Sequence, residues 1–192
     1  MSEVYIREEA GLHLDRANKL LAGLGNFGGN GSAAFHAVTS ALNRAAKSAK
    51  SKAGKFASEQ YVISQGGFKA HVRDKMFVNG GGTGVSGVRL VFAGSVIKLI
   101  EFGTRFTKDG GVAVSVKRGG GGTLSHAFIP ENMALGVYER VGSSRLPIEQ
   151  KYGPSAAHMM MDGTVTQNME DEIVTVFNDR IEHEINRILN GW

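Results

Sequence analysis

The sequence predicts an α+β fold: N-terminal helices, a small and mostly antiparallel sheet with long glycine-rich loops, and a long amphipathic C-terminal helix. Three observations support this fold class. Apolar residues recur at helical spacing in the first third of the chain and again near its end. Between about residues 88 and 141 they alternate as they do in strands, and glycines gather between these segments. The order helix, sheet, helix indicates α+β.

The predicted helix over 33–60 is amphipathic, with Ser32 as its N-cap. One arc carries apolar side chains: Phe35, Val38, Leu42, Ala45, Ala49, Ala53 and Phe56. The opposite arc carries Arg44, Lys47, Lys50, Lys52 and Lys55. We also expect shorter helices over 12–24 and 65–76. From about Thr164 a long apolar stripe predicts the C-terminal helix.

Short strands are expected in the middle of the chain, in an antiparallel meander. The predicted strand segments are 88–92, 112–116, 124–129 and 136–141, with a further apolar run at 96–102. A turn is predicted at Asp109–Gly111. The stretch 145–155 contains two prolines and is predicted to be irregular.

Glycine makes up 27 of the 192 residues, and 14 of these glycines lie in three clusters, at 23–31, 80–87 and 119–122. Glycine clusters mark turns and loops. We therefore expect loops that are mobile in the free subunit and settle against neighbours in an assembly, with a loop tip at the third cluster. The predicted organisation is an N-terminal helix and glycine-rich linker over 1–31, followed by one α+β domain over 32–192.

Composition excludes several classes of function. The chain has no cysteine, which rules out disulfide scaffolds, thiol catalysis and cysteine-ligated metals. No apolar run is long enough for a membrane helix, and the first residues do not resemble a signal peptide. The glycines at 23–28 match a dinucleotide-binding pattern but lack its preceding strand and its acidic partner. His183–Glu184 lacks the second histidine of a zinc protease motif. We expect no catalytic residue, cofactor or metal.

The net charge of +4 is distributed unevenly. Residues 44–118 carry 14 basic and 4 acidic side chains, whereas residues 119–192 carry 5 basic and 10 acidic ones. Such segregation can attract a polyanion or a neighbouring copy of the chain. Two functions stay open on this basis: non-specific DNA binding through the basic helix over 44–55, and a subunit of a ring closed by head-to-tail contacts.

Several short motifs carry a resemblance to a known family. In chain order they are Ala127–Phe128–Ile129, Tyr138–Glu139–Arg140, Arg145–Leu146–Pro147–Ile148 and Tyr152–Gly153–Pro154–Ser155. With the helix that follows, they resemble the C-terminal half of the phage minor tail protein Z family, also described as tail-completion proteins. Ala41–Leu42–Asn43–Arg44–Ala45–Ala46 resembles that family's basic helix. Glu101–Phe102–Gly103–Thr104–Arg105 resembles a motif of related neck proteins.

The resemblance implies a structural virion protein and no enzyme. Such a protein would complete the tail at its head-proximal end, between the tail terminator or tube and the head connector. It would be assembled in the host cytoplasm, as a hexameric ring around the DNA channel. The implied partners are other copies of the chain, those tail and neck proteins, and double-stranded DNA in the channel. The five basic residues would then face DNA or an acidic neighbour.

Overall fold

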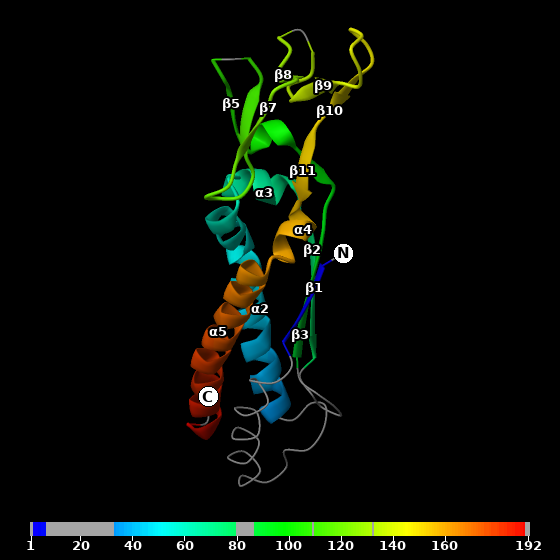
Figure 1. Cartoon of the computed structure of the whole chain (residues 1–192). Coiled ribbons are helices and arrows are strands. Elements are labelled where there is room, and N and C mark those ends of the chain that lie inside the picture. The colour runs from blue at the N-terminus through cyan, green and yellow to red at the C-terminus, as the bar shows by residue number, and fades with distance from the viewer. Residues whose placement is uncertain (1, 7–32, 80–86, 109, 132, 191–192) are drawn as a thin grey trace. The chain divides into compact units, whose positions relative to one another are not determined.

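A computed structural model of the chain describes residues 2–6, 33–79, 87–108, 110–131 and 133–190 (Figure 1). The predicted helix over 12–24 and the first glycine cluster lie outside these residues, as does most of the second cluster. The chain divides into two compact units. The β-rich unit comprises 54–73 and 93–165, and the helical unit comprises 2–53, 74–92 and 166–192. The predicted boundary near residue 32 stays a prediction.

The helical unit is built on two long helices at the predicted positions, α2 (Ala33–Gln60) and α5 (Gly163–Leu189). They lie side by side and antiparallel, because Ser40 of α2 bonds Glu184 whereas Ser48 bonds Glu172 (Figure 1). Most buried positions of α2 in this unit are alanines: Ala37, Ala41, Ala45, Ala46, Ala49 and Ala53. A face made of methyl groups lets two helix axes approach closely.

Helix α5 buries one narrow stripe, as the sequence predicts. The buried apolar side chains recur every four residues: Val165, Met169, Ile173, Phe177 and Ile181. The next turn continues the stripe with a carboxylate, because Glu184 is only 1% exposed. The two ends of this stripe therefore differ in chemistry.

A three-stranded sheet completes the helical unit, with strand order β1-β3-β2. Its strands are β1 (Ser2–Ile6), β2 (Arg73–Asn79) and β3 (Gly87–Ala93). Strand β1 pairs antiparallel with β3, with Val4 opposite Leu90. Val88, Leu90 and Phe92 of β3 are buried, and Val88 lines one hollow with Leu42 of α2. This face of β3 therefore points toward the helices.

The β-rich unit consists of short strands and two short helices. The helices are α3 (Gln65–His71) and α4 (Ala156–Met160), and the 3-10 turn η1 covers Leu99–Glu101. The strands are β4 (Val96–Lys98), β5 (Gly103–Phe106), β6 (Val112–Ser115), β7 (Gly122–Leu124), β8 (Ala127–Phe128), β9 (Tyr138–Arg140), β10 (Ile148–Gln150) and β11 (Tyr152–Ser155). They form the sheets β5-β6-β7, β10-β9-β8 and β11-β4.

The α+β class is confirmed, and three local predictions are wrong. The strand predicted over 124–129 is divided between β7 and β8, which belong to different sheets. The predicted helix over 65–76 ends at His71, because Val72 is extended and β2 begins at Arg73. The stretch 145–155 is not irregular throughout: β10 pairs with β9, and β11 pairs with β4. The partners of β11 lie more than 50 residues earlier in the chain, so no local pattern reports this pairing.

The glycine turn between β6 and β7 is short. Gly119 has φ +76, in the region that glycine adopts without strain, and Gly122 already belongs to β7. The Ser115 hydroxyl donates to the Gly120 carbonyl across the turn. The third glycine cluster is therefore a hairpin turn whose backbone conformation requires a glycine.

We expect the alanine face of α2 to be intolerant of larger side chains. Ala45 is fully buried, so Ala45→Leu should lower the free energy of unfolding by about 1–3 kcal/mol through overpacking. Lys47→Leu is the matched control, because Lys47 is exposed on the same helix. Urea unfolding followed by circular dichroism measures both, and equal stability of the two variants would contradict the close helix contact.

Candidate functional site

The five predicted basic residues lie along α2, and all are exposed except the half-buried Lys50. They do not form one arc opposite the apolar face as predicted, because Lys52 contacts α5 whereas Lys50 contacts β2. Three of them form ion pairs within the chain. Lys50 Nζ lies 3.2 Å from Asp74, Lys52 Nζ lies 2.7 Å from Glu172, and Lys55 Nζ lies 3.8 Å from Glu59. Arg44 and Lys47 have no acidic partner within the described part of the chain.

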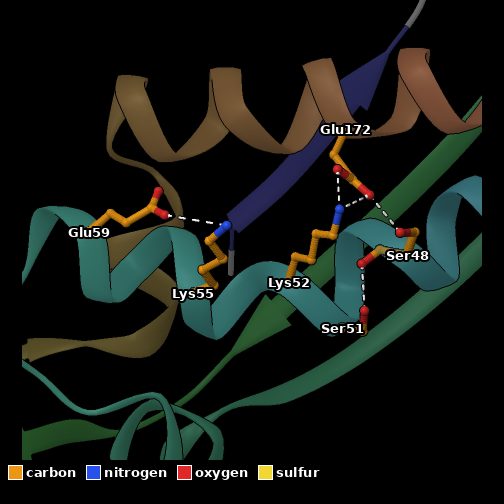
Figure 2. A network of polar contacts seen from close by, with 6 residues as sticks. All are labelled: Ser48, Ser51, Lys52, Lys55, Glu59 and Glu172. Atoms are coloured by element: carbon orange, nitrogen blue, oxygen red, sulfur yellow. Dashed lines mark hydrogen bonds and ion pairs between the residues drawn. The ribbon is translucent and has the colours of Figure 1, made fainter.

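Glu172 of α5 is the centre of a polar contact that joins the two long helices (Figure 2). Ser48 Oγ donates to its carboxylate at 2.6 Å, and Lys52 Nζ donates at 2.7 Å. The Glu172 side chain is only 13% exposed, so this ion pair is better shielded from water than Lys55–Glu59. The acidic C-terminal helix thus meets the basic helix inside one chain.

A fully buried carboxylate, that of Glu184, lies nearer the C-terminal end of α5. Ser40 Oγ donates to Glu184 Oε1 at 3.2 Å, and Arg187 Nη2 lies 3.0 Å from Oε2. The guanidinium contact is an ion pair without hydrogen-bond geometry, since Oε2 accepts no hydrogen bond. The pair balances the buried charge at the end of the apolar stripe.

Among the family-motif residues, the structure brings two pairs together, both in the β-rich unit. Phe102 is buried, and a Cβ at position 153 would lie 2.5 Å from its ring, so only glycine fits there. Arg140 lies over the Phe128 ring, with Cζ 5.7 Å from the centroid. Gly103 begins β5 against Val62, where a Cβ would lie 2.9 Å from Cγ1.

The remaining motif residues lie on or beside β10 and β11. Arg145 is exposed in the loop after β9. Pro147 follows a cis peptide bond, and its carbonyl accepts from Val141 N at 3.1 Å. Tyr152 is exposed and donates to Gln150 Oε1 at 3.0 Å, and Pro154 lies within β11. These residues therefore lie in strands and in the loop between them.

Large apolar side chains are exposed mainly in the β-rich unit. Eight of the nine exposed large apolar residues in the described part of the chain belong to it: Val96, Phe106, Met133, Leu135, Val141, Leu146, Tyr152 and Met161. Phe106 is 68% exposed and Leu146 is 67% exposed. In the sheet β5-β6-β7, both outer strands have an edge without a partner strand among the described residues. Exposed apolar groups beside open edges are typical of interaction surfaces.

Tyr61, Lys117 and Asp162 form a cluster of titratable groups in the β-rich unit. Lys117 Nζ lies 2.6 Å from Asp162 Oδ2, and Tyr61 donates to the same oxygen at 3.3 Å. The Lys117 hydrogen bond holds the pKa of Asp162 below its usual value, and the same bond raises the pKa of Lys117. Burial, then the nearby carboxylate, raises the pKa of Tyr61.

The pKa shifts of Tyr61 and Lys117 oppose a role of either side chain as a nucleophile or base. A nucleophile or base requires a phenolate or a neutral amine, and both raised pKa values oppose those forms. Asp162 also accepts from Thr164 N at 3.1 Å and so caps α5. The cluster therefore fastens the end of α2 to the start of α5.

No metal site is apparent in the described residues. They contain no group of three or more His, Asp or Glu side chains placed to hold a metal ion. A hollow in the helical unit is apolar apart from Asn178, and its lining includes Leu42, Val88, Ile173 and Phe177. None of the described helices combines the length and the apolar content that a bilayer crossing requires.

Sequence reasoning missed one surface, the exposed residues of β2 and β3. Lys75, Phe77 and Arg89 are exposed, and Arg89 Cζ lies 6.0 Å from the centroid of the Phe77 ring. Strand β2 does show the alternation of a strand, because the exposed Lys75 and Phe77 are separated by the half-buried Met76. The prediction of a helix over 65–76 assigned these residues to a helix and so concealed the strand.

Comparison of the chain with models of protein families, with curated proteins and with solved structures finds no match. The resemblance of its motifs to tail-completion proteins therefore has no independent support from those comparisons.

We expect the Glu172 contact to contribute to stability. Glu172→Gln should lower the free energy of unfolding by about 1 kcal/mol, because a shielded ion pair and its hydrogen bonds are weakened. The control is Glu59→Gln, which removes an exposed pair within one helix and should change stability by less than about 0.5 kcal/mol. Urea unfolding at neutral pH measures both; equal losses would argue against a special role for Glu172.

The Asp162 cluster should make stability depend on pH in acid. Because the pKa of Asp162 is lowered in the folded state, its contribution is complete above its unfolded value of about 3.9 and is lost as pH falls below it. Asp162→Asn should therefore flatten the acid limb of the stability profile while keeping the helix cap. Asp162→Ala should be about 1 kcal/mol less stable than Asp162→Asn, because it also loses the cap. Thermal unfolding between pH 2 and 7 tests this, and an unchanged acid limb in Asp162→Asn would refute it.

Proposed function

We propose that the chain is a structural subunit that completes the phage tail at its head-proximal end, as a ring around the DNA channel. Its partners would be further copies of itself, the tail terminator, the tail tube and the head connector. The place of action would be the neck of the virion, after assembly in the host cytoplasm. The resemblance of the sequence motifs is the basis for naming this family in the proposal. The exposed apolar surface of the β-rich unit is the physical observation that supports the proposal.

The observation that carries the proposal is the exposure of large apolar side chains on the β-rich unit. A sheet of three short strands has little core of its own, since its strands β5, β6 and β7 are only three or four residues long. Exposed groups such as Phe106 and Leu146 gain stability when a neighbouring protein covers them. A subunit whose exposed apolar groups become covered on association suits a role in a ring better than a role as a free enzyme.

A free-standing DNA-binding module is the second candidate. Arg44 and Lys47 favour it, because both are exposed and lack an acidic partner in the described residues. The other three basic residues of α2 are ion-paired within the chain, which reduces the charge available to phosphates. Two free cations on one helix are a weak basis for a DNA site.

Removing apolar groups from the β-rich unit should prevent association. Light scattering over a range of concentrations should give a multiple of the 20.5 kDa subunit mass for the chain alone or with the tail terminator of the same phage. The double variant Phe106→Ser/Leu146→Ser should lose this association. Because the Phe106 and Leu146 side chains are mostly exposed, the midpoint of urea unfolding of the double variant should be close to that of the wild type.

Phe77→Ser is the matched control, since Phe77 is an exposed aromatic residue of the helical unit. It should assemble like the wild type. A monomer that binds no tail protein at any concentration, or a double variant that assembles normally, would overturn the proposal.

A further inference from the structure

The outer face of strands β2 and β3 combines one exposed aromatic ring with two exposed cations. Phe77 is 54% exposed, and Lys75 and Arg89 are exposed beside it. The guanidinium of Arg89 lies over the Phe77 ring at 6.0 Å, so the two side chains share one face. Lys75 lies two residues before Phe77 and therefore on the same face.

This face points away from the helices of its own unit. Asp74, between the exposed Arg73 and Lys75, forms an ion pair with Lys50 of α2. On β3, Val88 and Leu90 are buried on either side of Arg89. In the described part of the chain no acidic side chain pairs with Lys75. The backbone register places one acidic residue of β1, Glu3, opposite Val91, two residues beyond Arg89.

We propose that this face binds single-stranded nucleic acid, with a base stacked on Phe77 and the adjacent phosphate held by Lys75. An exposed aromatic ring beside an exposed lysine on a strand surface provides both interactions that such binding requires. The ligand is single-stranded because the bases of a duplex are stacked on each other, so their faces cannot reach a ring on a sheet. The site is distinct from the basic helix and does not depend on ring formation.

A second copy of the chain is a weaker occupant. Its acidic element in the described residues is α5, whose fully exposed positions are all polar apart from Gly163. That surface offers carboxylates to Lys75 but only partly exposed apolar groups to cover Phe77. A nucleotide offers a negative phosphate and an aromatic base together.

Fluorescence anisotropy with a short labelled oligothymidylate tests the proposal on the full chain. Phe77→Ala should weaken binding about tenfold, as loss of one stacked base does. Phe77→Trp should restore binding, and Phe77→Leu should not, because it keeps the apolar group without the ring. Lys75→Gln should lower the slope of log affinity against log salt by about 0.7, the value for one phosphate contact to a single strand.

The matched control is Phe106→Ala/Lys108→Gln, which removes an exposed aromatic residue and a nearby exposed cation from the β-rich unit. It should leave oligonucleotide binding unchanged. Equal weakening by the control, binding by Phe77→Leu as tight as by the wild type, or no single-strand binding at low salt would overturn the proposal. A change of subunit mass in Phe77→Ala without a change in oligonucleotide affinity would assign the face to a second copy instead.

Discussion

The contact between the alanine face of α2 and the apolar stripe of α5 is the constraint on which the helical unit depends. Because the α2 side is mostly methyl groups, short serine side chains reach across to the partner helix at both Ser40 and Ser48. Glu172 and Glu184 can then be held in largely buried positions with hydrogen-bonded partners. Bulkier side chains on α2 would separate the helices and leave these carboxylates without partners.

The contact between α2 and α5 also brings part of the basic middle of the sequence against its acidic C-terminal end. In the sequence, a basic middle and an acidic end appear available to outside partners. In the structure, Lys52 is neutralised by Glu172, and Lys50 by Asp74. Charge segregation along a chain therefore need not survive as segregation on its surface, because folding can bring the two segments together. Other cations of the described residues, Arg44, Lys69 and Lys108 among them, form no such ion pair and keep their charge available.

Strongly periodic segments were predictable, whereas elements defined by distant partners were not. The helix predicted over 33–60 coincides with α2, because its periodic pattern runs over many turns. Its predicted N-cap, Ser32, lies outside the described residues. Strand β2 was missed, since its cations at Arg73 and Lys75 continue those of the preceding helix. Strands β10 and β11 are too short for a pattern. The contact of Phe102 with Gly153 joins residues about 50 positions apart, so no local spacing could indicate it.

That contact has an evolutionary consequence. The ring of Phe102 occupies the space in which a side chain at position 153 would begin. A side chain at position 153 and the ring at position 102 would therefore compete for the same space, so substitutions at the two positions are coupled. A lineage that replaced the glycine by alanine would first need a smaller residue at position 102. Among descendants of this sequence, the pair should change in a fixed order, with the phenylalanine lost before the glycine.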